Sequence, residues 1–172
     1  MTPASPERSL ATSYDDAARS PGLLLWRVTN RWQATVRAAL KPYGVTHVQF
    51  VLLASLTWLG EEGPVTQKRL ADHAATDPMM TSQVLRALEG RGLVERRAHP
   101  IDGRAKALAV TPEGAELANA TVTVVEACDR EFFAALRGDA SSFATALRTL
   151  AGDTGTTRHT RRRCESSPGP PR

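Results

Sequence analysis

Side chains of four chemical types, a thioether, a hydroxyl, an amide and a guanidinium, share one face of a helical pattern over residues 78–91. An amide can pair with adenine, a guanidinium with guanine, and a thioether can contact the methyl group of thymine. The same groups can instead contact phosphate or remain in solvent, and adjacent methionines can simply pack at a helix start. We take this face as a candidate for reading base edges; its residues are Met79, Ser82, Gln83 and Arg86.

A second group of charged residues surrounds a predicted turn that contains Pro100 and Gly103. A carboxylate two residues before an arginine can accept a hydrogen bond from the guanidinium and fix the turn, although an ordinary Asp-Gly turn with an exposed arginine has the same sequence. Neighbouring basic side chains suit phosphate contacts, which give affinity without sequence choice, or plain surface charge. These residues are Asp102 and Arg104, with Arg96, Arg97 and Lys106 on the flanking segments.

The candidate reading face belongs to a predicted helix whose other side is apolar. Asp77 supplies an N-cap oxygen, and Pro78 suits the first helical position because an N–H there would have no partner. A shorter amphipathic helix comes before it, from the N-cap Thr66 to Ala74. The core-facing residues of the second helix follow the spacing of a helix that lies on a core; they are Thr81, Val84, Leu85 and Leu88.

Two short strands follow the helices. Gly92 is a signal for the end of the second helix, and residues 93–97 and 106–110 are separated by a stretch rich in turn-forming residues. This pattern predicts a β-hairpin, to which Val65 can add a third short strand. Two helices followed by such a hairpin are typical of a winged helix-turn-helix, with the hairpin as the wing.

The rest of the chain is predicted to be helical. One long helix covers residues 21–40, and a second begins at the capping box formed by Thr46 and Gln49. After the hairpin, Thr111 caps another long helix, and a short one covers residues 142–151. The first long helix and the last two carry apolar stripes that should not remain in water, so we expect them to pack across a dimer. The stripes are Leu25, Val28, Trp32, Val36 and Leu40; Leu117, Thr121, Val124, Cys128, Phe132 and Leu136; and Phe143, Leu147 and Leu150.

Composition narrows the class of protein. The 172 residues carry a net charge of +4, and residues 66–108 hold eight basic against five acidic side chains. This excess favours an anionic partner. Two cysteines far apart predict no disulfide and a reducing compartment, and neither a signal peptide nor a membrane span is expected. We therefore expect a cytoplasmic protein.

Four segments in this order resemble the MarR family of winged helix-turn-helix transcriptional regulators, and the resemblance covers residues 21–151. It implies a mainly α fold with a small β-wing, in which a winged helix-turn-helix is flanked by N- and C-terminal dimerisation helices. The expected parts are a disordered tail (1–20), a dimerisation helix (21–45), the DNA-binding domain (46–111), C-terminal dimerisation helices (112–151) and a disordered basic tail (152–172). The segments are residues 70–72, 88–96, 102–104 and 108–114.

The resemblance implies a homodimer that binds an inverted repeat in promoter DNA, usually as a repressor released by a small molecule. It also implies that Arg104 enters the minor groove, where narrow A·T-rich segments concentrate negative potential, with Asp102 orienting it. The full set of predicted DNA-binding residues is Thr66, Gln67, Met79, Ser82, Gln83, Arg86, Arg97, Asp102, Arg104 and Lys106.

A small-molecule effector, where the family binds one, is expected between the dimerisation helices and the winged helix-turn-helix, which we call the reader. The predicted ligand-binding residues are ordinary core residues as well; they are Trp26, Trp32, His47, Phe50 and Trp58. Cys128 lies in an apolar stripe, where we expect an unreactive thiol rather than a redox sensor. The histidines form no cluster with metal-ligand spacing, so no metal and no cofactor is predicted.

Two other classes of protein would need different features in the sequence. An enzyme would need a nucleophile beside a base, paired carboxylates or a metal cluster, and Ser55 and Ser82 have no evident histidine partner. We therefore predict no catalytic residues. A winged helix that serves only as a protein-interaction or assembly module stays open as the alternative to a DNA-binding regulator, and it would bind DNA weakly and without sequence preference.

Overall fold

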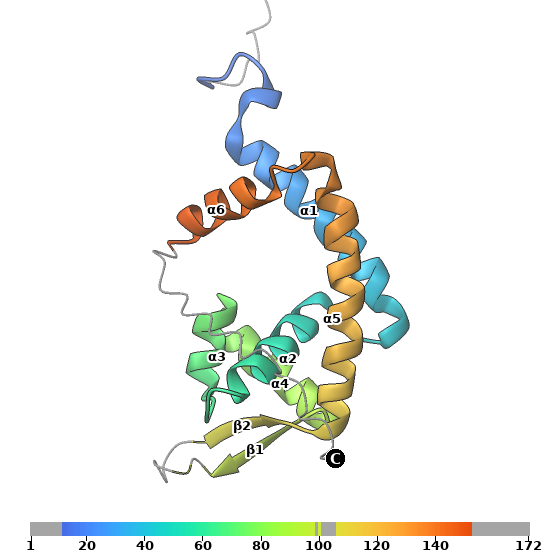
Figure 1. Ribbon diagram of the computed structural model, residues 1–172. Helices are drawn as coiled ribbons and strands as arrows, with labels where there is room; N and C mark the ends of the chain where they lie inside the picture. Colours follow the sequence, from blue (N-terminus) through green and yellow to red (C-terminus); the bar gives the residue numbers. More distant parts are fainter. Residues whose placement is uncertain (1–11, 99, 101–105, 153–172) are drawn as a thin grey trace, which may run out of the picture. The chain divides into compact units, whose positions relative to one another are not determined.

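The computed structural model describes residues 12–98, 100 and 106–152, which form two units divided between Phe132 and Phe133 (Figure 1). The structure is mainly helical with one small antiparallel sheet, as predicted. The first unit holds η1 (Ala17–Arg19), α1 (Pro21–Leu40), η2 (Lys41–Tyr43), α2 (His47–Gly60), α3 (Gln67–Ala74), α4 (Pro78–Gly90), β1 (Val94–Ala98), β2 (Lys106–Val110) and all of α5 (Pro112–Phe133) except its last residue. The second holds η3 (Ala134–Leu136) and α6 (Ala140–Ala151).

The helix starts are fixed by side-chain caps at the positions that the sequence predicts. Thr46 and Gln49 form the reciprocal capping box of α2, and Thr66 Oγ1 accepts from the N–H of Arg69 at 3.2 Å. Asp77 accepts from the first turn of α4, and Thr111 accepts from the N–H of Gly114 at 3.1 Å. Local sequence therefore determines where these helices begin.

The N-terminal segment differs from the prediction of a disordered tail up to Ser20. Ala17–Arg19 form a 3-10 helix, because Asp16 accepts from the N–H of Ala18 at 2.9 Å. Ser20 then caps α1 by accepting from the N–H of Leu23. The remaining predicted tail residues, 1–11 and 153–172, lie outside the described residues.

The wing is an antiparallel pair in which Val94 lies opposite Val110 and Ala98 opposite Lys106. The predicted third strand is confirmed as a single bridge, in which the N–H of Leu108 donates to the carbonyl oxygen of Val65 at 2.8 Å. This bridge attaches the wing to the segment before α3. The predicted turn between the strands falls in residues 99 and 101–105, outside the described residues.

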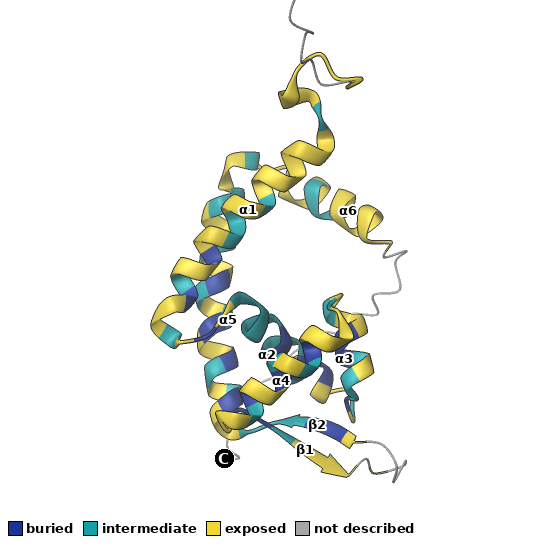
Figure 2. Ribbon diagram, turned by 180° about the vertical axis from the view of Figure 1, so that it is seen from behind, coloured by how far each residue is buried: buried dark blue, intermediate teal, exposed yellow. Residues whose placement is uncertain are grey.

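The main core lies between α2, α3, α4, the wing and the start of α5 (Figure 2). The core-facing side of α4 is confirmed: Thr81, Leu85 and Leu88 are buried and Val84 is half-buried. Thr81 is accommodated because its hydroxyl donates to the carbonyl oxygen of Asp77 at 2.8 Å. The opposite side of α4 is thereby turned outward.

Within one chain the buried positions of α5 coincide only in part with its predicted apolar stripe, which we expect to pack across a dimer. Thr121 is buried as expected, but Leu117, Val124, Cys128 and Phe132 are only half-buried. The most buried positions of the helix are instead Gly114, Ala118, Thr121 and Val125. The reason is a close approach of backbones: a Cβ on Gly114 would lie 2.1 Å from the carbonyl oxygen of Leu93. Small residues therefore mark the face of α5 that packs against the reader. The last residue of the predicted stripe, Leu136, lies in η3, beyond the end of α5.

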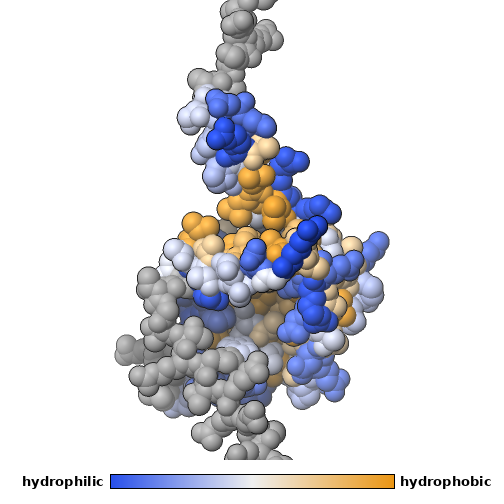
Figure 3. All heavy atoms as spheres, turned by 45° about the horizontal axis from the view of Figure 1, so that its top comes forward, coloured by the Kyte–Doolittle hydropathy of each residue, from blue (hydrophilic) through white to orange (hydrophobic). Residues whose placement is uncertain are grey.

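The first half of α1 is apolar and exposed. Val36 and Leu40 are buried with Val45 and Val125, whereas Leu25 and Val28 of the same predicted stripe are open. Figure 3 shows apolar side chains gathered where α1 begins. The exposed residues are Leu23, Leu24, Leu25, Trp26 and Val28. Among the described residues no helix is long and apolar enough to cross a bilayer.

Candidate nucleic-acid interface

The outward side of α4 carries the predicted base-reading residues. Met79 is 71% exposed at the first turn, Gln83 and Arg86 are exposed further along, and Ser82 is half-buried. Arg86 forms no hydrogen bond or ion pair with any described residue. A ligand can therefore approach its guanidinium without breaking a contact to the described part of the chain.

The start of α3 flanks this face. The Thr66 hydroxyl already serves as the N-cap acceptor, while Gln67 is half-buried at the first helical position. A hollow of about 360 Å³ separates this turn from the start of α4. Its lining joins the two predicted reader helices and consists of Gln67, Lys68, Ala71, Asp72 and Pro78. The polar groups of this concave surface come from α3, and Pro78 is the contribution of α4.

Most of the basic side chains of the reader are paired with acids of the same chain. Lys68 Nζ lies 2.8 Å from Asp72, and Arg69 Nη2 lies 2.6 Å from Glu62. On the wing, Arg97 pairs with Glu95. Sequence analysis did not identify these partners. The Lys68–Asp72 pair is at i, i+4 on α3 and the Arg97–Glu95 pair lies within β1, whereas Arg69 on α3 reaches Glu62 in the preceding loop.

Arg96, predicted to be a phosphate contact or a charge on the strand surface, forms an ion pair within the chain. Its Nε lies 2.5 Å from Glu89 Oε1, and both side chains are about two-thirds or more covered. The pair joins β1 to the last turn of α4. Arg96 therefore links the wing to the helix that carries the reading face. Lys106, by contrast, is exposed at the start of β2 and has no partner among the described residues.

The other two predicted wing residues, Asp102 and Arg104, lie outside the described residues.

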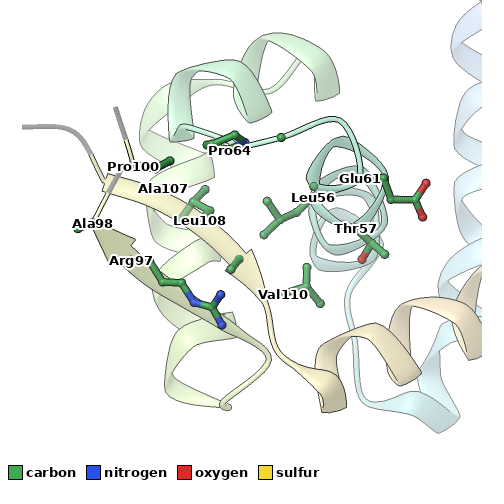
Figure 4. Close-up of a pocket in the computed structure, with 13 residues that line it drawn as sticks. Leu56, Thr57, Glu61, Pro64, Arg97, Ala98, Pro100, Ala107, Leu108 and Val110 are labelled. Carbon is green, nitrogen blue, oxygen red and sulfur yellow. The ribbon is translucent and has the colours of Figure 1, made fainter. Parts of the chain in front are cut away.

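A groove of about 460 Å³ runs between the end of α2 and the wing (Figure 4). Leu56, Leu108 and Val110 form its apolar floor, and Arg97 lies on the wing side. None of the predicted ligand-binding residues lines this groove or the hollow beside α3.

Three of the five predicted ligand-binding residues lie together. The rings of Trp32 and His47 meet edge to face at 5.1 Å, and His47 stacks with Phe50 at 6.4 Å. Sequence analysis missed Asp129, whose carboxylate accepts from Trp32 Nε1 at 2.7 Å and links α5 to α1. The other two predicted residues, Trp26 and Trp58, are 68% and 53% exposed.

The surroundings of His47 disfavour the charged form of its imidazole. Partial burial lowers the pKa of its imidazole below the ordinary 6.5, and the charge of Arg37 lowers it further. Asp129 acts in the opposite direction but does not reverse the shift. A neutral imidazole between two aromatic rings can donate one hydrogen bond and accept one.

The end of α4 is held by contacts that the sequence did not predict. Arg91 Nη1 donates to the carbonyl oxygen of Gly44 at 2.9 Å, and Thr111 Oγ1 donates to the carbonyl oxygen of Gly92 at 2.7 Å. Both acceptors are backbone groups, so no residue type in the sequence marks them.

Among the described residues no cluster of three metal-ligating side chains occurs, and Cys128 is a free, half-buried thiol.

Comparison with known proteins places these features in a family. Residues 45–106 match the sequence model described as the MarR family. The chain is 46% identical over 117 residues to the uncharacterized HTH-type transcriptional regulator YdcH of Bacillus subtilis, covering 67% of this chain and 80% of that one. It is 36% identical over 115 residues to the HTH-type transcriptional repressor Rv2887 of Mycobacterium tuberculosis, covering 67% and 81%.

Solved structures have the same fold. CouR from Rhodococcus jostii RHA1, bound to p-coumaroyl-CoA, is similar with a TM-score of 0.72 and 27% identity over 83% of this chain and 99% of CouR. The complex of Rv2887 with salicylic acid is similar with a TM-score of 0.61 and 35% identity over 79% of this chain and 98% of Rv2887.

Proposed function

Because the chain belongs to the MarR family of winged helix-turn-helix transcriptional regulators, we propose that it is a homodimeric repressor that binds an inverted-repeat operator. The family and the relatives are regulators of transcription and not enzymes. The observation that carries the proposal is the outer side of α4, where Gln83 and Arg86 are exposed and Arg86 has no partner among the described residues. Such groups on a helix suit the edges of bases in a major groove.

The proposed contacts divide into two kinds. Gln83 and Arg86 read bases, with Met79 at the helix start against thymine methyl groups. Lys106 contacts phosphate from the wing, with Arg97, and Thr66 and Gln67 approach the backbone from α3. Asp102 and Arg104 complete the wing contact in this proposal. Base contacts give sequence choice, whereas phosphate contacts give affinity that falls with salt.

A homodimer is proposed because the first half of α1 leaves five large apolar side chains in water. A contiguous exposed apolar surface on a soluble chain marks an interface. A two-fold dimer presents two copies of α4, which can reach half-sites one helical turn apart, about 34 to 36 Å, or a nearby spacing. An inverted repeat in the operator is the counterpart of that symmetry.

We also propose that an aromatic acid or its thioester releases the protein from DNA. The structures of Rv2887 and CouR contain salicylic acid and p-coumaroyl-CoA, respectively. In this chain Trp32 and Phe50 offer stacking surfaces on either side of His47, whose imidazole can donate to a carbonyl or carboxylate. The proposed release requires that the ligand bind the DNA-free form more tightly.

The test starts with selection of binding sites from random duplex DNA by the full chain, followed by affinity measurements at several salt concentrations. We expect an inverted repeat to emerge. Arg86→Ala and Gln83→Ala should then relax base preference, each position being worth about 1 to 3 kcal/mol of discrimination. Lys106→Ala should weaken all sequences alike and reduce the salt slope by about one.

Arg130→Ala is the matched control, since Arg130 is an exposed arginine on α5 outside the reader. It should leave both affinity and base preference unchanged. Affinity that stays around 10⁻⁴ to 10⁻⁶ M for every DNA sequence would refute sequence-specific regulation and favour an interaction module.

A further inference from the structure

Arg91 connects two parts of the first unit that are far apart in sequence. It stands at the C-cap of α4, and its guanidinium donates to the carbonyl oxygen of Gly44, 47 positions earlier. The distance of 2.9 Å is that of a charge-assisted hydrogen bond. The end of the proposed reading helix is thus attached to the corner between α1 and α2.

That corner is joined to the core around α1 through Val45. Gly44 has a φ of 64°, a left-handed conformation that glycine adopts at no steric cost, and its N–H donates to Lys41. The next residue, Val45, is buried in one cluster with Val36 and Leu40 of α1. A displacement of α1 must therefore carry the Gly44 carbonyl with it.

On its other side the end of α4 is attached to α5. The Thr111 hydroxyl donates to Gly92 at 2.7 Å, and the Thr111 N–H donates to Leu93 at 3.1 Å. Arg91 supplies the link to α1, so that together these bonds fix the end of α4 between both long helices. The two donors, Arg91 and Thr111, each lie directly at the boundary of a helix, where small changes of backbone angle reorient that helix.

We propose that Arg91 is a positioning residue, whose hydrogen bond to Gly44 makes α4 move with the α1–α2 corner and thereby sets the half-site spacing that the dimer accepts. This inference rests on the proposed function, because spacing has meaning only for a dimer on an inverted repeat. Without the bond, α4 keeps its attachment to α5 and the wing but loses the one to α1. The reader then tolerates spacings that the wild type rejects.

Arg91 is exposed, so a direct phosphate contact would be the alternative role for its charge. The two roles differ in their signatures. A phosphate contact changes the salt slope and weakens every DNA sequence by the same factor. A positioning contact leaves the slope unchanged and alters discrimination between operators. Lysine can still donate one hydrogen bond to a carbonyl, so Arg91→Lys should rescue the positioning role in part.

The first experiment needs no DNA. Amide hydrogen exchange of full-length Arg91→Met should rise on the order of 2- to 30-fold at residues 44–49 and 91–93 relative to wild type. Arg130→Met serves as the control for loss of a surface arginine and should match wild type. Unchanged exchange at these residues would overturn the proposal, and so would an equal rise in all helices, which would indicate a general loss of stability.

The second experiment uses the selected operator with one base pair inserted or removed between half-sites, which moves them by about 3.4 Å and rotates them by about 34°. Wild type should prefer one spacing. For Arg91→Met we expect that preference to fall on the order of 2- to 30-fold with an unchanged salt slope, and Arg91→Lys to recover part of it.

An unchanged spacing preference with a reduced salt slope would refute the positioning role and assign Arg91 to phosphate. If wild type selects no operator at all, the proposed function fails, and the exchange result alone still decides whether Arg91 couples α4 to the corner.

Discussion

Replacing Gly114 by alanine tests whether the start of α5 is held against the reader as closely as the structure indicates. An alanine Cβ would lie 2.1 Å from the carbonyl oxygen and 3.0 Å from the carbonyl carbon of Leu93, and 3.0 Å from Val110 Cγ1. An ordinary carbon-to-oxygen contact is about 3.3 Å, so α5 and Leu93 must separate by roughly 1.2 Å. The obstacle is backbone, which cannot rotate away as a side chain can.

The expected cost follows from three contributions. Overpacking of a tight interior costs about 1 to 3 kcal/mol. A shift of this size also weakens the Thr111 bonds to Gly92 and Leu93, at about 1 kcal/mol each. Alanine in a helix recovers about 1 kcal/mol relative to glycine. We therefore expect Gly114→Ala to lower the free energy of unfolding by about 2 to 4 kcal/mol.

Urea unfolding of the full chain at one fixed protein concentration measures this difference, since a dimer's stability depends on concentration. Gly90→Ala is the matched control, because a Cβ on Gly90, also in a helix, meets nothing within 4 Å. It should be neutral or stabilise the protein by up to about 1 kcal/mol. A Gly114→Ala protein within 1 kcal/mol of wild type would refute the close approach of α5 to Leu93 and the argument built on it.

Two further predictions concern the reader and the aromatic cluster. Ala75 follows the end of α3 with a φ of 49°, so Ala75→Gly should stabilise the protein by about 0.5 to 1 kcal/mol. Ala120→Gly, at an exposed position inside α5, should destabilise the protein by about as much. Midpoints of urea unfolding that shift in the same direction for both variants would contradict this. Because the pKa of His47 is lowered on folding, the unfolded chain binds more protons as the pH falls through 6.5, and stability should decrease there. His47→Gln should remove this part of the pH dependence of thermal unfolding, and an unchanged pH profile would count against the neutral imidazole.

Features encoded by neighbouring residues could be predicted from the sequence. The buried and exposed sides of α4 follow from residue spacing, and the caps at Thr46, Thr66 and Asp77 follow from side chains that bond within three residues. The bridge at Val65 was predictable because an apolar β-branched residue lay beside a predicted sheet. In each case the interacting groups are close in the chain or of a distinctive type.

Other features depend on contacts that residue type does not reveal. The predicted stripe of α5 followed its large apolar residues, but its closest packing is at Gly114, where the absence of a side chain allows the backbones to meet. The exposed Leu25 shows a related limit: its apolar spacing predicts burial, and a single chain offers nothing to bury it. Arg91 lacked any signal, since its partner is a backbone carbonyl that every residue carries.

The pairing of charges in the reader bears on how the proposed regulator chooses its operator. Non-specific binding is driven by cations that neutralise phosphates, and a genome offers a vast excess of such sites. Lys68, Arg69 and Arg97 each face an acid of the same chain, which reduces the charge they present to any duplex. These pairs are largely exposed and therefore weak, so phosphates in a well-fitted complex can still replace the acids. No acid in the described part of the chain competes in this way for Arg86. The arrangement lowers attraction to random DNA while leaving the base-reading group free, which raises the ratio of specific to non-specific affinity.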